Sequence, residues 1–358
     1  MRTANPAPLL RLCTPEDALA AVPYLLGFHP SDSLVVLGMR DTRLVFSVRG
    51  DLPAPGARVR REAAHLSRVF ARHGADTVLM IGYGPAERVT PLVLAARRRF
   101  QARGIEVADI IRAADGRYWS YACQSPECCP PDGTAYDVAA SRIAAEATFA
   151  GQVALPDRES LARRLAAPEG AALATMERAT ERAEQQLAEL LDCGAGQPAA
   201  AAAFAAAGVT AVAEAARRYS SGGRLTDEEV AELSLLLASI PVRDFAWQPI
   251  GPDAGETEPS TVELYVRLWS DVVSRARPDT VAPAASLLAY AAWQAGDGTT
   301  AAIAVDRALA ADPGYSMALL MAEVLYQAIP PSEAGRVRTP GRRRRRARRA
   351  APQRAGRR

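Results

Sequence analysis

The sequence contains no lysine, so all 43 of its basic residues are arginines. It also contains a single asparagine, Asn5, while alanine is abundant. We interpret this bias as GC-rich codon usage and not as a selected preference for the guanidinium group. Arginine content by itself therefore indicates no function.

Signals for secretion or membrane insertion are also lacking. Residues 1–10 show no apolar core of a secretory signal, and no uncharged run of about 18 apolar residues occurs. Residues 198–216 come closest, but they are mostly alanine and contain Glu214. We therefore expect a cytoplasmic protein that does not associate with a membrane. Its five cysteines should be reduced unless they bind metal.

Known catalytic motifs are absent. The sequence has no HExxH, no GxSxG and no Walker A loop, and residues 82–85 (GYGP) form only a short turn signal between a strand and a helix. None of these motifs therefore supports a zincin protease, an α/β-hydrolase or a P-loop enzyme. The sequence thus favours a non-catalytic protein.

Charge is distributed unevenly along the chain. Subtracting the twelve arginines of residues 335–358 from the net charge of +3 leaves −9 for residues 1–334. The densest part of the tail consists of Arg342, Arg343, Arg344, Arg345, Arg346, Arg348 and Arg349. We expect residues 332–358 to be disordered and to bind nucleic acid or another polyanion through counterion release. The alternative is a low-complexity extension without a role.

The N-terminal part alternates between strand and helix patterns. Thr14 and Pro15 mark a helix start, because Thr is a favoured N-cap and Pro a favoured first helical residue. Strand-like runs follow at residues 33–39, 44–48, 77–81, 105–111 and 118–122, with helical patterns at 57–73 and 86–103. The predicted class is α+β or α/β, with a mixed β-sheet flanked by helices in residues 1–154.

The first two strands predict a β-hairpin with a two-residue turn at Asp41 and Thr42. That register places Asp32 opposite Asp51, with His29 close by. Two facing carboxylates repel each other and therefore predict a cation or a shared proton between them. One hypothesis is a small catalytic or metal-binding site formed by His29, Asp32 and Asp51. The alternative is a tight loop in which Asp32 makes an Asx-turn.

Residues 155–331 contain helical patterns only, and they predict an all-helical second domain. Within it, residues 282–315 match one helical hairpin of the tetratricopeptide pattern, including the small residues Ala301 and Ala308 and a closing Asp312-Pro313. We expect tetratricopeptide-like packing without a demonstrated repeat array.

A Cys- and Pro-rich loop follows the last strand-like run. Cys123, Cys128 and Cys129 supply three thiols within seven residues, and thiolates are soft ligands that suit zinc. The loop lacks a CxxC spacing and a nearby histidine. The alternative is a rigid loop with buried, reduced thiols.

Several segments together resemble a known family. Residues 14–39, which include PYLLGFHPSDSLVVLGM, the RYWSY motif at 117–121 with its following cysteines, and residues 292–318 resemble the actinobacterial domain-of-unknown-function 4192 family. The resemblance extends over about residues 9–330. It implies no activity and no catalytic residues.

Three functions follow as expectations. The first is a non-catalytic interaction or regulatory protein whose helical domain binds a protein partner. The second is an enzyme or a small-ligand or metal-binding protein with its site at the end of the first hairpin. The third is association with nucleic acid through the arginine-rich tail.

Overall fold

The computed structural model describes residues 13–123, 125–191, 197–251 and 258–336. The chain divides into two compact units, Met1–Ala166 and Ala167–Arg358. The predicted arginine tail lies outside the described residues from position 337 onward.

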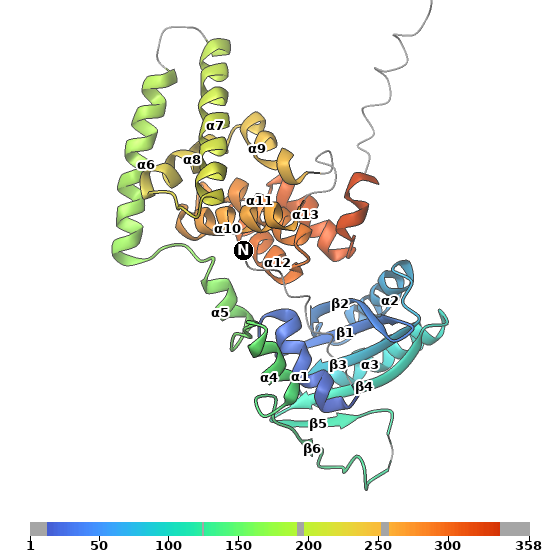
Figure 1. Ribbon diagram of the computed structural model, residues 1–358. Helices are drawn as coiled ribbons and strands as arrows, with labels where there is room; N and C mark the ends of the chain where they lie inside the picture. The colour runs from blue at the N-terminus through green and yellow to red at the C-terminus, as the bar shows by residue number, and fades with distance from the viewer. Residues whose placement is uncertain (1–12, 124, 192–196, 252–257, 337–358) are drawn as a thin grey trace, which may run out of the picture. The chain divides into compact units, whose positions relative to one another are not determined.

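The first unit contains a six-stranded sheet and five helices (Figure 1). Its elements are α1 (Pro15–Leu26), β1 (Ser33–Arg40), β2 (Arg43–Asp51), α2 (Ala57–Arg72), β3 (Thr77–Tyr83), α3 (Ala86–Gln101), β4 (Glu106–Ala114), β5 (Arg117–Ser120), β6 (Thr134–Ala135), α4 (Arg142–Phe149) and α5 (Arg158–Arg163). The strand order is β2-β1-β3-β4-β5-β6, and only β3 and β4 pair in parallel. The prediction of a mixed sheet flanked by helices is confirmed.

Helices cover both faces of this sheet. Leu19 and Val22 of α1 pack with Val35, Leu37 and Ile81 on one face. Alternate residues of the same strands face α2 and α3, because side chains along a strand point to opposite sides. On that second face Gly38 meets the ring of Phe70, and Gly82 meets Val89. The result is three layers, with the sheet in the middle.

Local sequence signals account for the element boundaries in the first unit. Thr14 Oγ1 accepts a hydrogen bond from the Asp17 amide (3.1 Å), and the Asp17 carboxylate accepts one from the Thr14 amide (3.1 Å), which completes a capping box for α1. The turn between β4 and β5 has positive φ at both Asp115 (51°) and Gly116 (72°). A type I′ hairpin turn requires this conformation at both positions.

The second unit is helical throughout its described residues. It contains α6 (Gly170–Leu191), α7 (Gln197–Ser220), α8 (Asp227–Leu236), α9 (Ile240–Trp247), η1 (Gln248–Ile250), α10 (Pro259–Arg275), α11 (Val281–Gln294), α12 (Gly298–Ala311), α13 (Ser316–Tyr326) and η2 (Pro331–Arg336). The helical hairpin predicted at residues 282–315 corresponds to α11 and α12, which pack closely together. Helix α9 and the 3₁₀ turn after it were not predicted.

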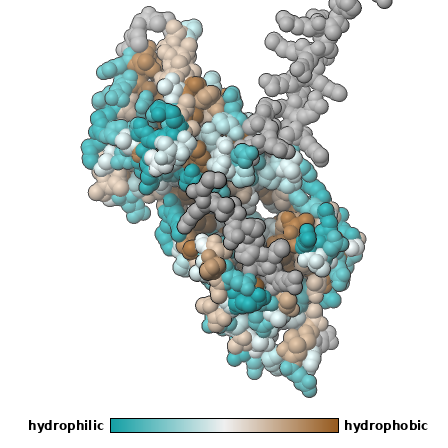
Figure 2. Space-filling view, in the orientation of Figure 1, coloured by the Kyte–Doolittle hydropathy of each residue, from teal (hydrophilic) through white to brown (hydrophobic). Residues whose placement is uncertain are grey.

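Helix α11 forms the centre of the helical unit. Each residue from Val281 to Trp293 is buried, which is typical of a helix that is apolar on all sides. Helices α10, α12 and α13 pack around it. By contrast, the visible side of α6 is mostly hydrophilic (Figure 2), in agreement with its exposed glutamates and arginines.

Helix α7 is the one described helix that is long and apolar enough to cross a membrane by length and composition. Alanine supplies most of its apolar character, and the helix packs against α6, α8, α9 and α10. A helix of a globular core satisfies the same criterion, so this is weak evidence for a membrane span.

Candidate functional site

The end of the first hairpin differs from the prediction by one residue. The turn at Asp41 and Thr42 is as predicted, since Arg40 pairs with Arg43. A β-bulge next to Gly38 and Met39 then leaves Val45 as an extra residue in β2. Asp51 consequently pairs with Ser33 and not with Asp32, so the predicted opposition of two carboxylates is wrong.

His29, Asp32 and Asp51 are held by separate contacts. Asp51 forms an ion pair with Arg49 (Nη1–Oδ1 2.6 Å), and its side chain is 80% exposed. The Asp32 carbonyl accepts a hydrogen bond from the amide of Leu52 (2.9 Å), and the His29 amide donates to a backbone carbonyl near α5. Within the described residues, the side-chain atoms of these three residues that could bind a metal do not form a group close enough to share one ion.

The three predicted cysteines do come together. The Sγ atoms of Cys123, Cys128 and Cys129 lie within 4.8 Å of one another, and we call this group the thiol cluster. It is the one group of three or more potential metal ligands in the described parts of the chain. The hydrogen bond with Cys123 and partial burial raise the pKa of Cys129 to about 12. The Ser125 amide and the hydrogen bond with Cys129 lower the pKa of Cys123.

A second candidate site lies between α2 and α3, where charge accumulates. A cleft of about 510 Å³ is lined by Arg61, Ala64, Ser67, Arg68, Arg99, Ala102 and Arg103. We call it the arginine cleft. Four of the seven lining residues are cations and none is an acid. The other three lining residues, Ala64, Ser67 and Ala102, have small side chains.

The cations of the arginine cleft are available for a ligand. Arg61, Arg68 and Arg99 are exposed and form no ion pair with a carboxylate in the described structure. Arg103 donates through Nε to the buried hydroxyl of Ser67 (3.1 Å), which leaves its terminal nitrogens free to bind a ligand. Unpaired guanidinium groups that face one cleft favour an anionic ligand, especially one with phosphate oxygens.

The basic character extends beyond the cleft. Helices α2 and α3, together with Arg103, carry ten arginines and two glutamates. None of the exposed large apolar or aromatic side chains lies on these two helices. We call this surface the α2/α3 face. It is a strongly positive region on a body whose overall charge is negative.

Sequence reasoning missed the α2/α3 face because it averaged charge over residues 1–334. A signal was present, since Arg61 and Arg68 are seven residues apart and therefore lie on one side of a helix. The run at residues 97–99 is a second signal. Their convergence with Arg103 depends on the packing of α2 against α3, which the sequence pattern alone does not specify.

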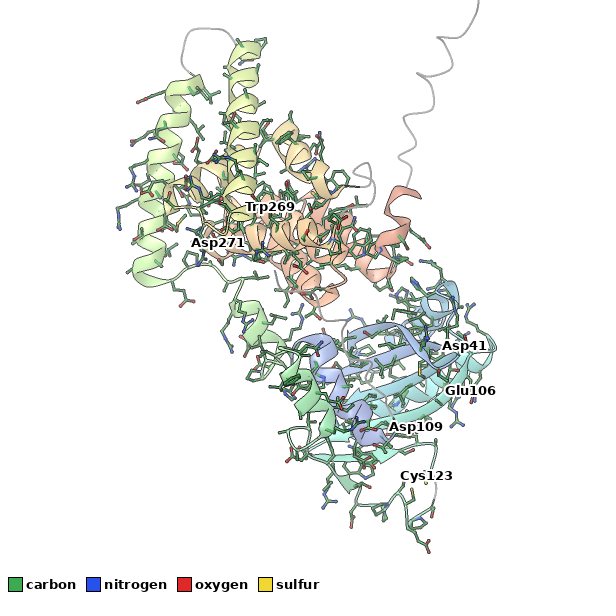
Figure 3. The ribbon with its side chains drawn as sticks, in the orientation of Figure 1. Asp41, Glu106, Asp109, Cys123, Trp269 and Asp271 are labelled. Carbon is green, nitrogen blue, oxygen red and sulfur yellow. The ribbon has the colours of Figure 1, made fainter. Side chains whose placement is uncertain are left out.

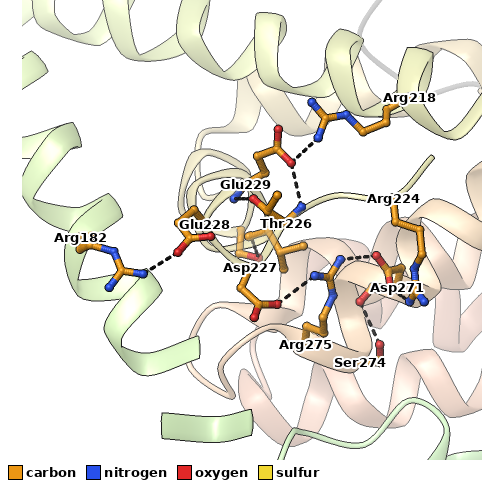
Figure 4. A network of polar contacts seen from close by, with 12 residues as sticks. Arg182, Arg218, Arg224, Thr226, Asp227, Glu228, Glu229, Asp271, Ser274 and Arg275 are labelled. Atoms are coloured by element: carbon orange, nitrogen blue, oxygen red, sulfur yellow. Dashed lines mark hydrogen bonds and ion pairs between the residues drawn. The ribbon is translucent and has the colours of Figure 1, made fainter. Parts of the chain in front are cut away.

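The helical unit contains a buried polar network centred on Asp271 (Figures 3 and 4). The side chain of Asp271 is 4% exposed and accepts hydrogen bonds from Tyr219, Arg224 and Arg275. Burial favours a raised pKa for Asp271, but these hydrogen bonds and the Arg275 charge outweigh it and lower the pKa. Arg275 also pairs with Asp227 (3.0 Å) at the start of α8. The network therefore connects α8 to α10 and has a structural role.

The fold and the two sites describe a two-unit protein, an α/β unit with a basic helical face followed by a helical unit. A family model described as "Domain of unknown function (DUF4192)" matches residues 15–332 of the chain. The chain therefore belongs to this family. No curated protein and no solved structure matches it.

Proposed function

We propose that this protein is a non-catalytic, cytoplasmic interaction protein whose α2/α3 face binds the phosphate backbone of duplex nucleic acid. The observation that carries the proposal is the arginine cleft, with four guanidinium groups and no carboxylate in its lining. Arginine binds phosphate oxygens in a bidentate manner, and clustered cations gain affinity by releasing the counterions of the nucleic acid.

The size of the α2/α3 face supports an extended ligand. Each helix has 16 residues and is therefore about 24 Å long. That length corresponds to about seven base pairs of duplex, at 3.4 Å per pair. Arginines such as Arg58, Arg60 and Arg97 continue the positive surface outside the cleft. A small phosphorylated molecule would leave these outer cations unused.

The absence of exposed aromatic side chains from the α2/α3 face supports a duplex over a single strand. Proteins that bind single strands commonly stack bases on aromatic rings, at about 1–3 kcal/mol per base. Phosphate contacts alone position a protein on a duplex without reading its sequence. Binding should therefore be independent of sequence and sensitive to salt.

The test measures binding of a fluorescent 20-base-pair duplex by anisotropy over a salt series. Four phosphate contacts contribute a slope of about −3.6 to the plot of log K against log salt, at about −0.9 per contact. The double variant Arg61→Gln, Arg99→Gln should reduce the magnitude of the slope by about 1.8. The matched control, Arg142→Gln with Arg163→Gln, removes two exposed arginines from α4 and α5 and should leave the slope close to that of the wild type.

The arginine tail is a second proposed contact with polyanions, so each protein is also measured without residues 335–358. If the tail contributes, its deletion lowers affinity, while the difference between the cleft variant and its control persists. Equal slopes for the cleft variant and the control in both backgrounds would rule out the α2/α3 face. A single-stranded oligonucleotide that binds more tightly than the duplex would contradict the proposed ligand.

Protein binding by the helical unit is the second candidate function. The specific observation is α13, where Leu319, Leu320 and Tyr326 are about half exposed. The terminal helix of a stacked helical array usually has a polar outer side, so exposed leucines there indicate a partner helix. A partner recovered from the native host should be lost with Leu319→Glu and Leu320→Glu, and retained with Ile240→Glu on α9. Equal recovery with both proteins would rule out α13 as the contact.

A further inference from the structure

The thiol cluster lies in the segment that connects β5 to β6. Cys128 and Cys129 are adjacent in sequence, and their Sγ atoms are 4.0 Å apart. The amides of both residues donate to the Ser125 carbonyl (3.2 and 2.7 Å), which folds this part of the segment into a tight turn. The turn brings both thiols toward Cys123, which lies five residues before Cys128 and six before Cys129. The convergence therefore has a defined backbone geometry.

The C-terminal side of the segment is fixed to the sheet. The indole Nε1 of Trp119 donates to the Pro131 carbonyl (2.9 Å), and Arg117 donates to the Gly133 carbonyl (2.7 Å). A Cβ at Gly133 would lie 2.5 Å from the Trp119 ring, so only glycine allows this approach. On β4, the Arg112 guanidinium stacks over the same ring, 3.5 Å from its centre.

The N-terminal side of the segment is held by a hydrogen-bonded chain. Asp109 Oδ1 accepts from Ser120 Oγ (2.8 Å), and Ser120 Oγ accepts from the amides of Ala122 (3.1 Å) and Cys123 (3.2 Å). The serine hydroxyl thus uses its one proton and both lone pairs. Asp109 and Cys123 are labelled in Figure 3. Such outer partners commonly orient metal ligands.

The sulfur positions fit coordination of one metal ion better than a disulfide. A tetrahedral zinc with Zn–S bonds of about 2.3 Å places its sulfurs about 3.8 Å apart. The Cys128–Cys129 separation of 4.0 Å is close to this value, and all three sulfurs lie within 4.8 Å of one another. A disulfide requires about 2.05 Å and would leave the third thiol unpaired. Three thiols gathered within 4.8 Å are compatible with one shared ion.

We propose that Cys123, Cys128 and Cys129 bind one Zn²⁺ through three thiolates, with the fourth position open to solvent or an external ligand. Thiolates select soft ions, and zinc readily accepts tetrahedral thiolate coordination. Within the described residues, no further His, Cys, Asp or Glu belongs to the cluster. Cys128 is exposed and the other two cysteines are partly exposed, so the ion is accessible from outside.

The ion also closes the segment. Asp109 of β4 and Ser120 and Trp119 of β5 hold the two ends of the β5–β6 segment. The ion would join Cys123 to Cys128 and Cys129 between these ends. Binding requires each thiol to lose its proton, so zinc affinity falls as pH is lowered. The site is independent of the arginine cleft, whose lining comes only from α2, α3, Ala102 and Arg103.

The experiment titrates the full-length, fully reduced protein with Zn²⁺ and with Co²⁺ as a spectroscopic substitute. We expect one equivalent of metal per chain and a thiolate-to-cobalt charge-transfer band, together with visible bands of tetrahedral cobalt. Ellman's reagent should react with five thiols in the metal-free protein and with two when zinc is bound. Zinc added to the cobalt form should abolish the cobalt bands.

Loss of an outer partner of a metal ligand weakens binding by about 10- to 100-fold. Loss of a ligand itself should have a larger effect, so we expect Zn²⁺ binding to weaken by more than about 100-fold in each of the variants Cys123→Ser, Cys128→Ser and Cys129→Ser. Cys13→Ser, which removes a free exposed cysteine outside the cluster, should bind zinc as the wild type does. The proposal is overturned if all five thiols of the wild type react at the same rate with zinc present. Cobalt bands that persist in all three cluster variants would also overturn it. The thiol-reactivity measurement uses only the wild-type protein, so a variant that fails to fold does not decide the outcome.

Discussion

Replacing Asp271 by asparagine tests whether the buried polar network stabilises the helical unit. The carboxylate accepts hydrogen bonds from Tyr219, Arg224 and Arg275, and an asparagine keeps the size of the side chain but loses its charge. Its NH₂ group would also place donors against donors. The effect should therefore arise from electrostatics and not from a cavity.

The magnitude depends on the exposure of the three partners. Arg224 is 74% exposed, so its ion pair contributes little to the free energy of unfolding. Arg275 is 21% exposed and keeps Asp227 as a second partner, which compensates part of its charge. The remaining interaction is the hydrogen bond from Tyr219 to the buried, charged carboxylate of Asp271, which contributes about 1.5–3 kcal/mol. We expect Asp271→Asn to lower the free energy of unfolding by about 2 kcal/mol.

Tryptophan fluorescence during urea unfolding provides the assay. Three of the four tryptophans, including the buried Trp269, belong to the helical unit, so the signal reports mainly on that unit. Asp279→Asn is the matched control, because the Arg277–Asp279 pair has a carboxylate that is 57% exposed. The control should change stability by less than about 0.5 kcal/mol. A change of that size for Asp271→Asn would refute the reasoning.

The pH dependence has a defined sign. Because the pKa of Asp271 is lowered in the folded protein, its contribution is fully present above its unfolded value of about 3.9. As pH falls below that value, toward the folded pKa, the carboxylate takes up a proton and the contribution is lost. The difference between the wild type and Asp271→Asn should be constant from pH 7 to about pH 5 and should shrink below about pH 4. A difference that grows on acidification would contradict this assignment.

Two further substitutions test the first unit, each measured as the midpoint of thermal unfolding by circular dichroism. Gly82→Ala should destabilise the protein by about 1–3 kcal/mol, because the new Cβ would lie 2.2 Å from Val89 Cγ1. Gly50→Ala is its control and should be close to neutral, because no atom would lie within 4 Å of the new Cβ. An equal effect of both glycine substitutions would contradict the packing argument. Thr14→Ala should cost about 1 kcal/mol through loss of the α1 cap, and Thr14→Ser should restore it. A serine variant as unstable as the alanine variant would show that the cap hydroxyl is not responsible.

The first hairpin shows how far the sequence predicts the fold. The β-branched runs and the Asp41-Thr42 turn predict both strands, but the predicted register places Phe46 opposite Leu37, on the face toward α1. The bulge moves Phe46 opposite Gly38, where its ring lies 4.3 Å from that of Phe70 on α2. Gly38 has no side chain and makes room for this packing. A glycine within a strand is a recognised sign of a bulge, so the sequence did contain a signal.

The sites depend more strongly on tertiary structure than the elements do. The three cysteines are close in sequence, so their convergence could be suspected, although the anchors Trp119 and Asp109 come from strands whose positions the sequence does not give. The arginine cleft requires two helices to pack side by side. The resemblance to the family is confirmed over residues 15–332, but it provides no chemistry for either site. Both assignments therefore rest on geometry.

The α2/α3 face has a regulatory consequence, because its cations are all arginines. A lysine surface can be neutralised by acetylation, but a guanidinium group is not a substrate for that modification and keeps its charge at every physiological pH. A chain without lysine has no side-chain amine at which acetylation or ubiquitination could occur. Occupancy of this face would then be controlled by ionic strength, by competing polyanions and by the amount of protein in the cell.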